Sequence, residues 1–147
     1  LDWTDYNGHM NVGYYGIAFD QASDVLLQDY LGVGEEYVKQ SGQGPYILQS
    51  HTHFLREMKL DEEFSVLFRV LDHDRKRVHF FGEMISDRDG ALCATQEVMM
   101  MNVDHETGRS AEYPDWAVRR FARMKADHAG LDVPAQVGAP LGLRRKG

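Results

Sequence analysis

The chain has 147 residues, of which 43% are hydrophobic and 27% charged, and this is the composition of one globular domain rather than of a disordered chain. Its 16 Lys and Arg against 23 Asp and Glu give a formal net charge of −7, which argues against a nucleic-acid-binding module but not against a local basic pocket. The single cysteine, Cys93, cannot form an internal disulfide, and no apolar run could span a membrane. We therefore expect a cytoplasmic protein without nucleic-acid or membrane partners.

The first element expected is a long helix over residues 11–30. Apolar side chains recur there at steps of three and four, on a stripe so broad that it predicts a helix surrounded by other structure. Asn11 has the side chain of an N-cap, and Gly32 marks the end of the helix. A short second helix is expected over residues 34–42.

Four strands are expected after these helices. They are rich in β-branched and aromatic residues and cover residues 46–56, 64–71, 76–86 and 91–103. Short polar connections between them predict an antiparallel meander. The last strand is apolar on both faces, as expected if the helix covers one face and a second subunit the other. This order predicts an α+β domain over residues 1–114, with the helix on one face of the sheet.

Residues 115–147 differ from the rest in composition and are expected to lie outside that domain. The first part, 115–130, has the pattern of an amphipathic helix. The remainder is rich in Gly and Pro and is basic, which is typical of an arm rather than of a packed element.

The densest polar cluster is DWTDYNGHMN at residues 2–11, directly before the long helix. Asp5, Asn7, His9 and Asn11 fall close together there, and a glycine allows a tight turn between them. An ordinary capped helix start would explain the Asp, Asn and Gly residues, but not the His and aromatic residues among them. An open helix N-terminus can hold a carbonyl oxygen that gains negative charge, and a carboxylate one turn away can act on that carbonyl.

The segment D-Y-N-G-H-M-N, followed by Tyr14-Tyr15, resembles the signature of the hotdog-fold acyl-CoA thioesterases of the 4-hydroxybenzoyl-CoA type. In that family an antiparallel sheet wraps around a long helix. The resemblance extends from Asp2 to about Val103. It implies a hotdog fold for this chain and an acyl-CoA substrate.

The resemblance also implies roles for single residues. Asp5 would be the nucleophile or the general base. The backbone N–H of Val12 and its neighbours would polarise the thioester carbonyl. Gly8, His9 and Asn11 would shape the loop and cap the helix.

Within the family, the chain is most similar to the betainyl-CoA thioesterases of carnitine breakdown. The shared features are W-x-D-Y-N-G-H, a histidine on the first strand after the helix, which is His51 here, and a D-R-K-R-x-H hairpin. A trimethylammonium acyl group favours an aromatic cage. Trp3, Tyr6, Tyr14 and Tyr15 are the candidates for contact with the substrate, although packing in the core would explain the same aromatic residues.

The resemblance further implies how the protein assembles. Sites in this family form between subunits, so we expect a homodimer or a homotetramer. No metal or cofactor is expected, since coenzyme A enters only as part of the substrate. Relatives carry a strand before the Asp motif, and here it would lie upstream of Leu1.

A metal site is a second hypothesis. His51, His53 and Glu57 have the H-x-H-x-x-x-E spacing of cupin metal ligands. However, no second cupin motif follows, and a long buried helix does not belong in a cupin barrel. We therefore favour one histidine that lines the acyl pocket and one that is structural.

The remaining candidates lie on the predicted hairpins. Arg75 and Arg77 belong to the only dense basic group before the C-terminal region and are predicted to clamp the nucleotide phosphates of CoA, with a solvated hairpin tip as the alternative. Glu83 lies among apolar residues and is a candidate at the edge of the site.

Taken together, these features favour an acyl-CoA thioesterase that hydrolyses a small acyl-CoA. The alternative is a non-catalytic or dehydratase-type hotdog protein that binds CoA or carrier-protein esters.

Overall fold

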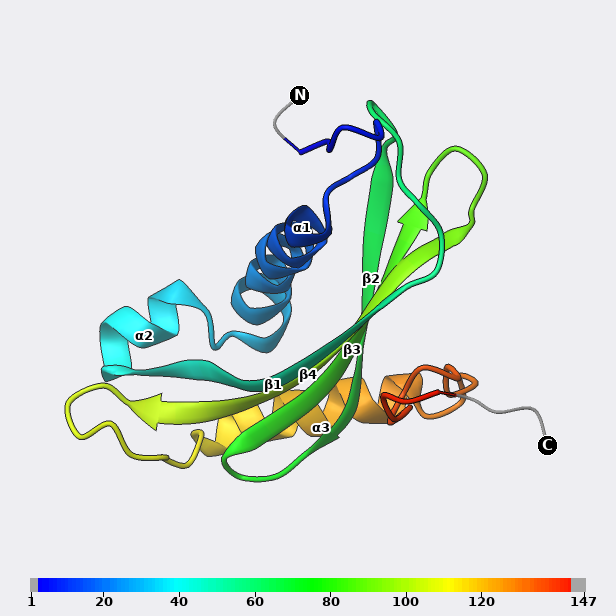
Figure 1. Ribbon diagram of the computed structural model, residues 1–147. Helices are drawn as coiled ribbons and strands as arrows, with labels where there is room; N and C mark the ends of the chain where they lie inside the picture. The colour runs from blue at the N-terminus through cyan, green and yellow to red at the C-terminus, as the bar shows by residue number, and fades with distance from the viewer. Residues whose placement is uncertain (1–2, 144–147) are drawn as a thin grey trace.

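The computed structural model describes residues 3–143 (Figure 1). Its helical elements are α1 (Val12–Val25), η1 (Leu26–Leu31), α2 (Glu35–Ser41) and α3 (Asp115–His128). Its strands are β1 (Gln43–Phe54), β2 (Phe64–His73), β3 (Arg77–Ser86) and β4 (Leu92–Asp104). The π-helical turn η1 continues α1 directly, so the helix predicted over 11–30 is present. Residues 144–147 of the expected arm lie outside the described residues.

The four strands form one antiparallel sheet in the order β1-β4-β3-β2. The predicted meander is therefore correct from β2 to β4 but wrong at its first join, because β1 pairs with β4 instead of β2. The nine residues 55–63 are too long for a tight hairpin. They are bound to the start of β4, where the backbone N–H groups of Leu55 and Arg56 both donate to the carbonyl of Cys93.

The helix α1 packs closely on one face of the sheet, and Gly82 at the centre of β3 makes this possible. A β-carbon at Gly82 would lie 2.7 Å from the ring of Phe68 and 3.1 Å from the ring of Phe19. Side chains that share the orientation of this position on β3 therefore face α1, and their odd-numbered neighbours face away from it.

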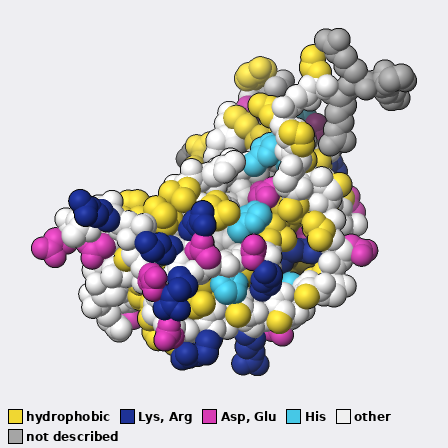
Figure 2. Space-filling model, turned by 90° about the horizontal axis from the view of Figure 1, so that it is seen from below, with side chains coloured by type: hydrophobic (Ala, Val, Ile, Leu, Met, Phe, Trp, Pro, Cys, Tyr) yellow, Lys and Arg dark blue, Asp and Glu magenta, His cyan; other side chains and the backbone are white. Residues whose placement is uncertain are grey.

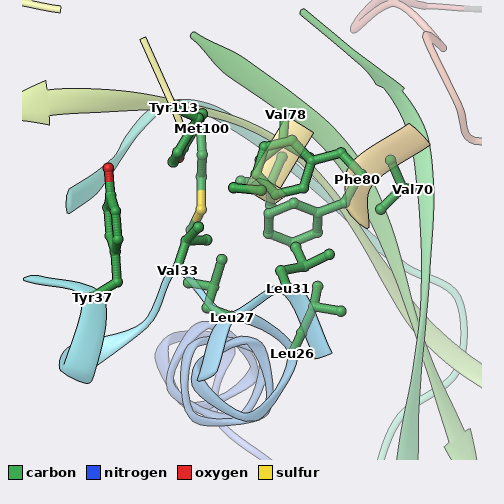
Figure 3. Close-up of a cluster of buried hydrophobic side chains, with 13 residues drawn as sticks. Leu26, Leu27, Leu31, Val33, Tyr37, Val70, Val78, Phe80, Met100 and Tyr113 are labelled. Carbon is green, nitrogen blue, oxygen red and sulfur yellow. The ribbon is translucent and has the colours of Figure 1, made fainter. Parts of the chain in front are cut away.

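The core consists of two clusters of buried side chains. The larger joins η1, α2 and α3 to the sheet and is drawn in Figure 3, where Leu27 and Leu31 point toward Val78 and Phe80. The smaller cluster lies nearer the start of α1 and includes Phe19. The site described below is built on this smaller cluster.

One side of α1 is not covered by the described chain. Phe19 is fully buried, whereas Val12 is 64% exposed and Val25 50% exposed. The prediction of a helix surrounded on all sides is therefore only half correct for a single chain. An apolar side chain left at this exposure is a candidate for contact with another subunit.

The helix α3 lies beside β2 and the segment after it crosses the face of the sheet away from α1. His128 of α3 accepts a hydrogen bond from the Val70 backbone N–H (3.4 Å). Farther along, the carbonyl of Asp132 accepts a hydrogen bond from Arg69 (2.8 Å), and the backbone N–H of Gly138 donates to Glu97 (2.8 Å). The described part of the expected arm is therefore held on the sheet at two points, although most of its residues stay exposed.

A groove of about 640 Å³ lies between α1 and β2, with Trp3 at one end and Phe64 and Val66 along β2. Met124 and His128 of α3 also line it. The strand expected upstream of Leu1 stays a prediction. Among the described helices, none combines the length and the apolar character needed to cross a membrane.

Candidate active site

The polar motif forms a compact hairpin-like loop, which we call the Asp5 loop (residues 3–11). Its two sides are joined by an isolated β-bridge between Thr4 and Met10. The Asp5 N–H donates to the carbonyl of His9 (2.9 Å), and Gly8 turns the chain with a φ of 76°, which a residue with a β-carbon rarely adopts. The prediction that Gly8 allows a tight turn is confirmed.

The carboxylate of Asp5 is held by its own loop. Its Oδ1 accepts the backbone N–H of Asn7 (2.8 Å) and that of His9 (3.4 Å). Its Oδ2 has no hydrogen-bond partner among residues 3–143. One carboxylate oxygen therefore fixes the orientation of the side chain and the other is free to act on a bound molecule.

The N-terminus of α1 keeps an open amide. Asn11 caps the helix, since its side-chain oxygen accepts the Gly13 N–H (3.0 Å) and its carbonyl accepts the Tyr14 N–H (2.9 Å). The N–H of Val12 has no acceptor within the described part of the chain. The role predicted for Asn11 as the N-cap is confirmed, and capping leaves Val12 as the amide that could face a developing oxyanion.

The segment after β1 supports the Asp5 loop, and sequence reasoning did not identify it. Lys59 forms an isolated bridge with His9, and Glu57 lies 3.5 Å from the His9 ring nitrogen Nε2. The carbonyl of Met58 accepts the N–H of Met10 (2.8 Å). Backbone contacts of this kind do not depend on residue type, so no sequence pattern reveals them. In this segment only the acidic Glu57, which lies close to His9 in the structure, is of a residue type that could have indicated a functional site.

A buried carboxylate anchors this segment in turn. The side chain of Glu62 is only 4% exposed and pairs with Arg56. It also accepts hydrogen bonds from the Ser86 hydroxyl (2.6 Å) and the Lys59 N–H (3.1 Å). These contacts, with the Ser86 hydrogen bond as the largest cause, lower the pKa of Glu62. Lys59 forms a bridge with His9 of the Asp5 loop, so Glu62 helps to hold the loop in place through Lys59.

We expect Glu62→Gln to reduce the free energy of unfolding at neutral pH by about 2–3 kcal/mol, because Arg56 loses its buried partner and keeps only the more exposed Asp89. A lowered pKa in the folded state means that this stability is present above the unfolded value, about 4.3, and is lost as the pH falls through the folded value. Urea denaturation at neutral pH and near pH 3.5 measures this pH-dependent part of the free energy of unfolding. The wild type should lose more stability between the two conditions than the variant, and equal losses would contradict the prediction.

Two of the predicted substrate-binding residues lie on the face of the sheet away from α1. Glu83 neighbours Gly82 on β3 and therefore points away from the helix. Glu83 pairs with Thr95 of β4, and Thr95 pairs with His53 of β1, so all three side chains lie on this face. His51 is two residues before His53 on β1 and therefore shares the face. A single chain therefore does not bring His51 or Glu83 to the Asp5 loop.

The polar residues on that face are engaged with one another. Glu83 pairs with Arg69 (3.4 Å), and His79 lies 2.8 Å from Glu97. Figure 2 shows histidine side chains interleaved with acidic ones on the underside of the molecule. The rings of His51 and His53 are 4.4 Å apart, between centroids. Because both histidines share this face, neither lines a pocket beside α1.

The arrangement of the histidines also bears on the metal hypothesis. Glu57 turns toward His9 and away from His51 and His53, so the cupin-like spacing does not form a cluster. Across residues 3–143, no group of three or more His, Cys, Asp and Glu side chains could hold a metal ion.

The predicted phosphate clamp lies at the other end of the sheet. Arg77 pairs with Met101 near the end of β4, whereas Phe54, close to the Asp5 loop, pairs with Ala94 near its start. Arg75 contacts Glu112 and Asp115, and Arg77 contacts Asp74 (2.6 Å). Within one chain these arginines neither reach the Asp5 loop nor lack anionic partners, so the clamp stays a prediction.

The candidate aromatic residues separate into different environments. Trp3 and Tyr14 stack with ring centroids 5.1 Å apart and an interplanar angle of 22°. Tyr15 is buried at 5% exposure, whereas Tyr6 is 98% exposed. Of the four, only the pair Trp3–Tyr14 presents stacked, half-buried rings beside the Asp5 loop.

The thioesterase-like superfamily model matches residues 1–121. The chain belongs to the thioesterase-like superfamily. A betainyl-CoA thioesterase of Pseudomonas aeruginosa is 32% identical over 142 residues, which are 97% of this chain and 89% of that protein. An L-carnitine dehydrogenase/betainyl-CoA thioesterase of Rhizobium meliloti is 35% identical over 143 residues, which are 97% of this chain but 28% of that longer protein.

Among solved structures, a hypothetical protein from Staphylococcus aureus in complex with CoA has a TM-score of 0.90 and 27% sequence identity, and the match covers 97% of this chain and 89% of that one. These matches confirm the predicted thioesterase family, the similarity to its betainyl-CoA branch and the α+β hotdog fold class. The superfamily model ends at residue 121, inside α3, so the segment that follows this helix lies outside the matched region.

Proposed function

We propose that this thioesterase-like chain hydrolyses a small acyl-CoA to the free acid and CoA. One observation carries the proposal: the unpaired oxygen of Asp5 and the open N–H of Val12 lie within one short segment, residues 5–12. The Val12 N–H and the positive end of the α1 dipole would stabilise the oxygen of the thioester as it gains charge. Asp5 would attack the carbonyl carbon or take a proton from the water that does.

The thiolate leaves at a different stage in each route. In the direct route, the carboxylate oxygen forms a bond to the carbonyl carbon, the carbon–sulfur bond breaks, and water then cleaves the mixed anhydride to release the acid and restore Asp5. In the water route, Asp5 takes a proton from the water, the water oxygen forms a bond to the carbonyl carbon, the carbon–sulfur bond breaks, and Asp5 returns the proton to the thiolate. Both routes require an ionised Asp5, and neither requires a metal. A thiol-release assay with a panel of acyl-CoA esters tests the proposal, and an inactive wild type would overturn it.

We further propose that the acyl group is betainyl. The names of the P. aeruginosa and R. meliloti relatives support this substrate, as does the stacked pair Trp3–Tyr14 beside the Asp5 loop. An aromatic face attracts a quaternary ammonium group more strongly than a neutral group of the same shape. Replacing the ammonium nitrogen with carbon gives 3,3-dimethylbutanoyl-CoA, a neutral substrate of nearly identical size.

We expect the wild type to prefer betainyl-CoA over 3,3-dimethylbutanoyl-CoA in kcat/KM. Trp3→Ala should reduce that ratio by about 3- to 30-fold, the range that one cation–π contact supplies. Steady-state kinetics with both esters measure the ratio, and the neutral ester controls for lost packing. An unchanged ratio in Trp3→Ala would remove Trp3 from the acyl site.

We propose that the active form is at least a dimer in which β1 pairs with β1 of a second copy. β1 is an edge strand, and three consecutive apolar residues on it, Tyr46, Ile47 and Leu48, are each about half exposed. Antiparallel pairing around a two-fold axis would place the Gln43 end of the partner strand beside the Phe54 end of this one. Phe54 contacts Tyr15 near the Asp5 loop, so the second copy would form one side of the site.

A further inference from the structure

Tyr15 differs from the other candidate aromatic residues in what its hydroxyl contacts. It lies in the first turns of α1 and is 5% exposed, with its ring edge-on to Phe54 at 5.1 Å between centroids. Its hydroxyl oxygen accepts a hydrogen bond from the buried N–H of Met58 (3.1 Å). Burial raises the pKa of Tyr15, so the hydroxyl stays neutral at physiological pH. A side chain in this position is not placed to form the open wall of a substrate pocket.

This contact continues through the backbone to the Asp5 loop. The same residue, Met58, uses its carbonyl to accept the N–H of Met10 (2.8 Å) and is itself fully buried. Met10 precedes the N-cap Asn11 directly. Two hydrogen bonds and five peptide links therefore close a ring that starts at Met10, passes through α1 to Tyr15 and returns through Met58.

This closed path of bonds fixes the orientation of the Val12 N–H relative to the Asp5 carboxylate, on which the proposed chemistry depends. Without the Tyr15 hydroxyl, the first turn of α1 could rotate relative to the segment that carries Met58, and the Val12 N–H would rotate with it. The Asp5 carboxylate would not follow, because Asp5 is bound to the backbone of Asn7 and His9 on the far side of the loop. A displacement of about 1 Å between reacting groups is enough to cost up to about a hundredfold in rate.

We propose that Tyr15 is a positioning residue that sets the Val12 N–H against the Asp5 carboxylate through Met58 and Met10. This rests on the proposed function, since it assigns Tyr15 a part in the same reaction. We expect Tyr15→Phe to lower kcat by about 10- to 100-fold. The KM for the acyl-CoA should change by less than about twofold, because the group lost aligns the transition state and does not touch the substrate.

Tyr37→Phe is the matched control. Tyr37 is also buried, at 8% exposure, and its hydroxyl donates to Gln43 (3.1 Å) and accepts from Asn102 (3.1 Å) in the part of the core that contains α2. This substitution removes the same atom and more hydrogen bonds from the fold than Tyr15→Phe does, without touching the Asp5 loop. Thermal unfolding should show a loss of stability at least as large for Tyr37→Phe as for Tyr15→Phe, while only Tyr15→Phe loses kcat.

A kcat equal to the wild type in folded Tyr15→Phe, or an equal loss in both variants, would overturn the proposal. If Tyr15→Phe does not fold, two analogues at position 15 decide the matter. 4-Methylphenylalanine keeps the volume without an acceptor, and 3-fluorotyrosine keeps the phenol oxygen that accepts the Met58 N–H. The fluoro analogue should retain more kcat than the methyl analogue, and equal values would refute the role. An inactive wild type would refute the proposed function itself, which is a separate outcome.

Discussion

Replacing Asp5 with asparagine is expected to lower kcat for thioester hydrolysis by at least about a thousandfold. Asparagine keeps the side-chain oxygen that accepts the backbone N–H groups of Asn7 and His9, so the Asp5 loop should keep its shape. What it removes is the negative charge on the second oxygen, which either route of hydrolysis needs. Thiol release from the preferred ester, followed over a wide range of enzyme concentration, measures the loss.

A matched substitution separates this effect from a general loss of negative charge. Asp127 is exposed on α3, without a hydrogen bond or ion pair in the described part of the chain. Asp127→Asn should therefore hydrolyse the ester like the wild type. An Asp5→Asn variant with more than about a tenth of wild-type kcat would rule out Asp5 as nucleophile or base. The chain would then be better described as a binder of CoA esters, with catalysis elsewhere or absent.

A positive charge at Leu48 is expected to separate the subunits and to lower kcat/KM by at least about a hundredfold, if the second copy completes the site. Leu48 lies in the bulge of β1, between Ile47 and Gln49, and has no partner in the ladder with β4. Leu48→Lys should therefore leave the fold of each chain intact while placing an unpaired charge in the proposed interface. Sedimentation velocity and light scattering report the mass, and the thiol assay reports the activity.

Leu131→Lys is the control for this substitution. Leu131 is 52% exposed, against 51% for Leu48, but it lies after α3 and far along the chain from β1. It should leave both mass and activity unchanged. A wild type that is monomeric at assay concentrations would refute the dimer. A monomeric Leu48→Lys variant with full activity would instead show that one chain holds the whole site.

The parts of the fold and of the site that were predictable from sequence are those that depend on neighbouring residues. The period of the apolar residues located the long helix, and Asp5, Gly8 and Asn11 lie in one loop because few residues separate them. The alternation of β-strands correctly placed His51 and His53 on one face. The alternation could not show which face this is, because the answer depends on where α1 packs. The structure shows it at Gly82, which the ring of Phe19 on α1 approaches closely.

The remaining differences arise from pairings distant in sequence. Nothing in β1 specifies that it pairs with β4 rather than with β2, because antiparallel strands of similar composition carry little information on their order. Arg75 and Arg77 lie far from the Asp5 loop for a different reason: β3 begins at the end of the sheet where β4 ends, whereas Phe54 pairs with the start of β4. The contribution of Met58 was not predictable either, because it supports the site through its backbone and any residue type has the same N–H and carbonyl.

The way in which the segment after α3 is held on the sheet has a consequence for how its sequence can vary. In the two hydrogen bonds that attach it, the segment contributes only main-chain atoms, the carbonyl of Asp132 and the N–H of Gly138. The side chains that recognise these atoms, Arg69 and Glu97, belong to the sheet. The segment can therefore change most of its residues over evolution and keep its place, whereas changes at Arg69 and Glu97 would remove the two hydrogen bonds that hold it.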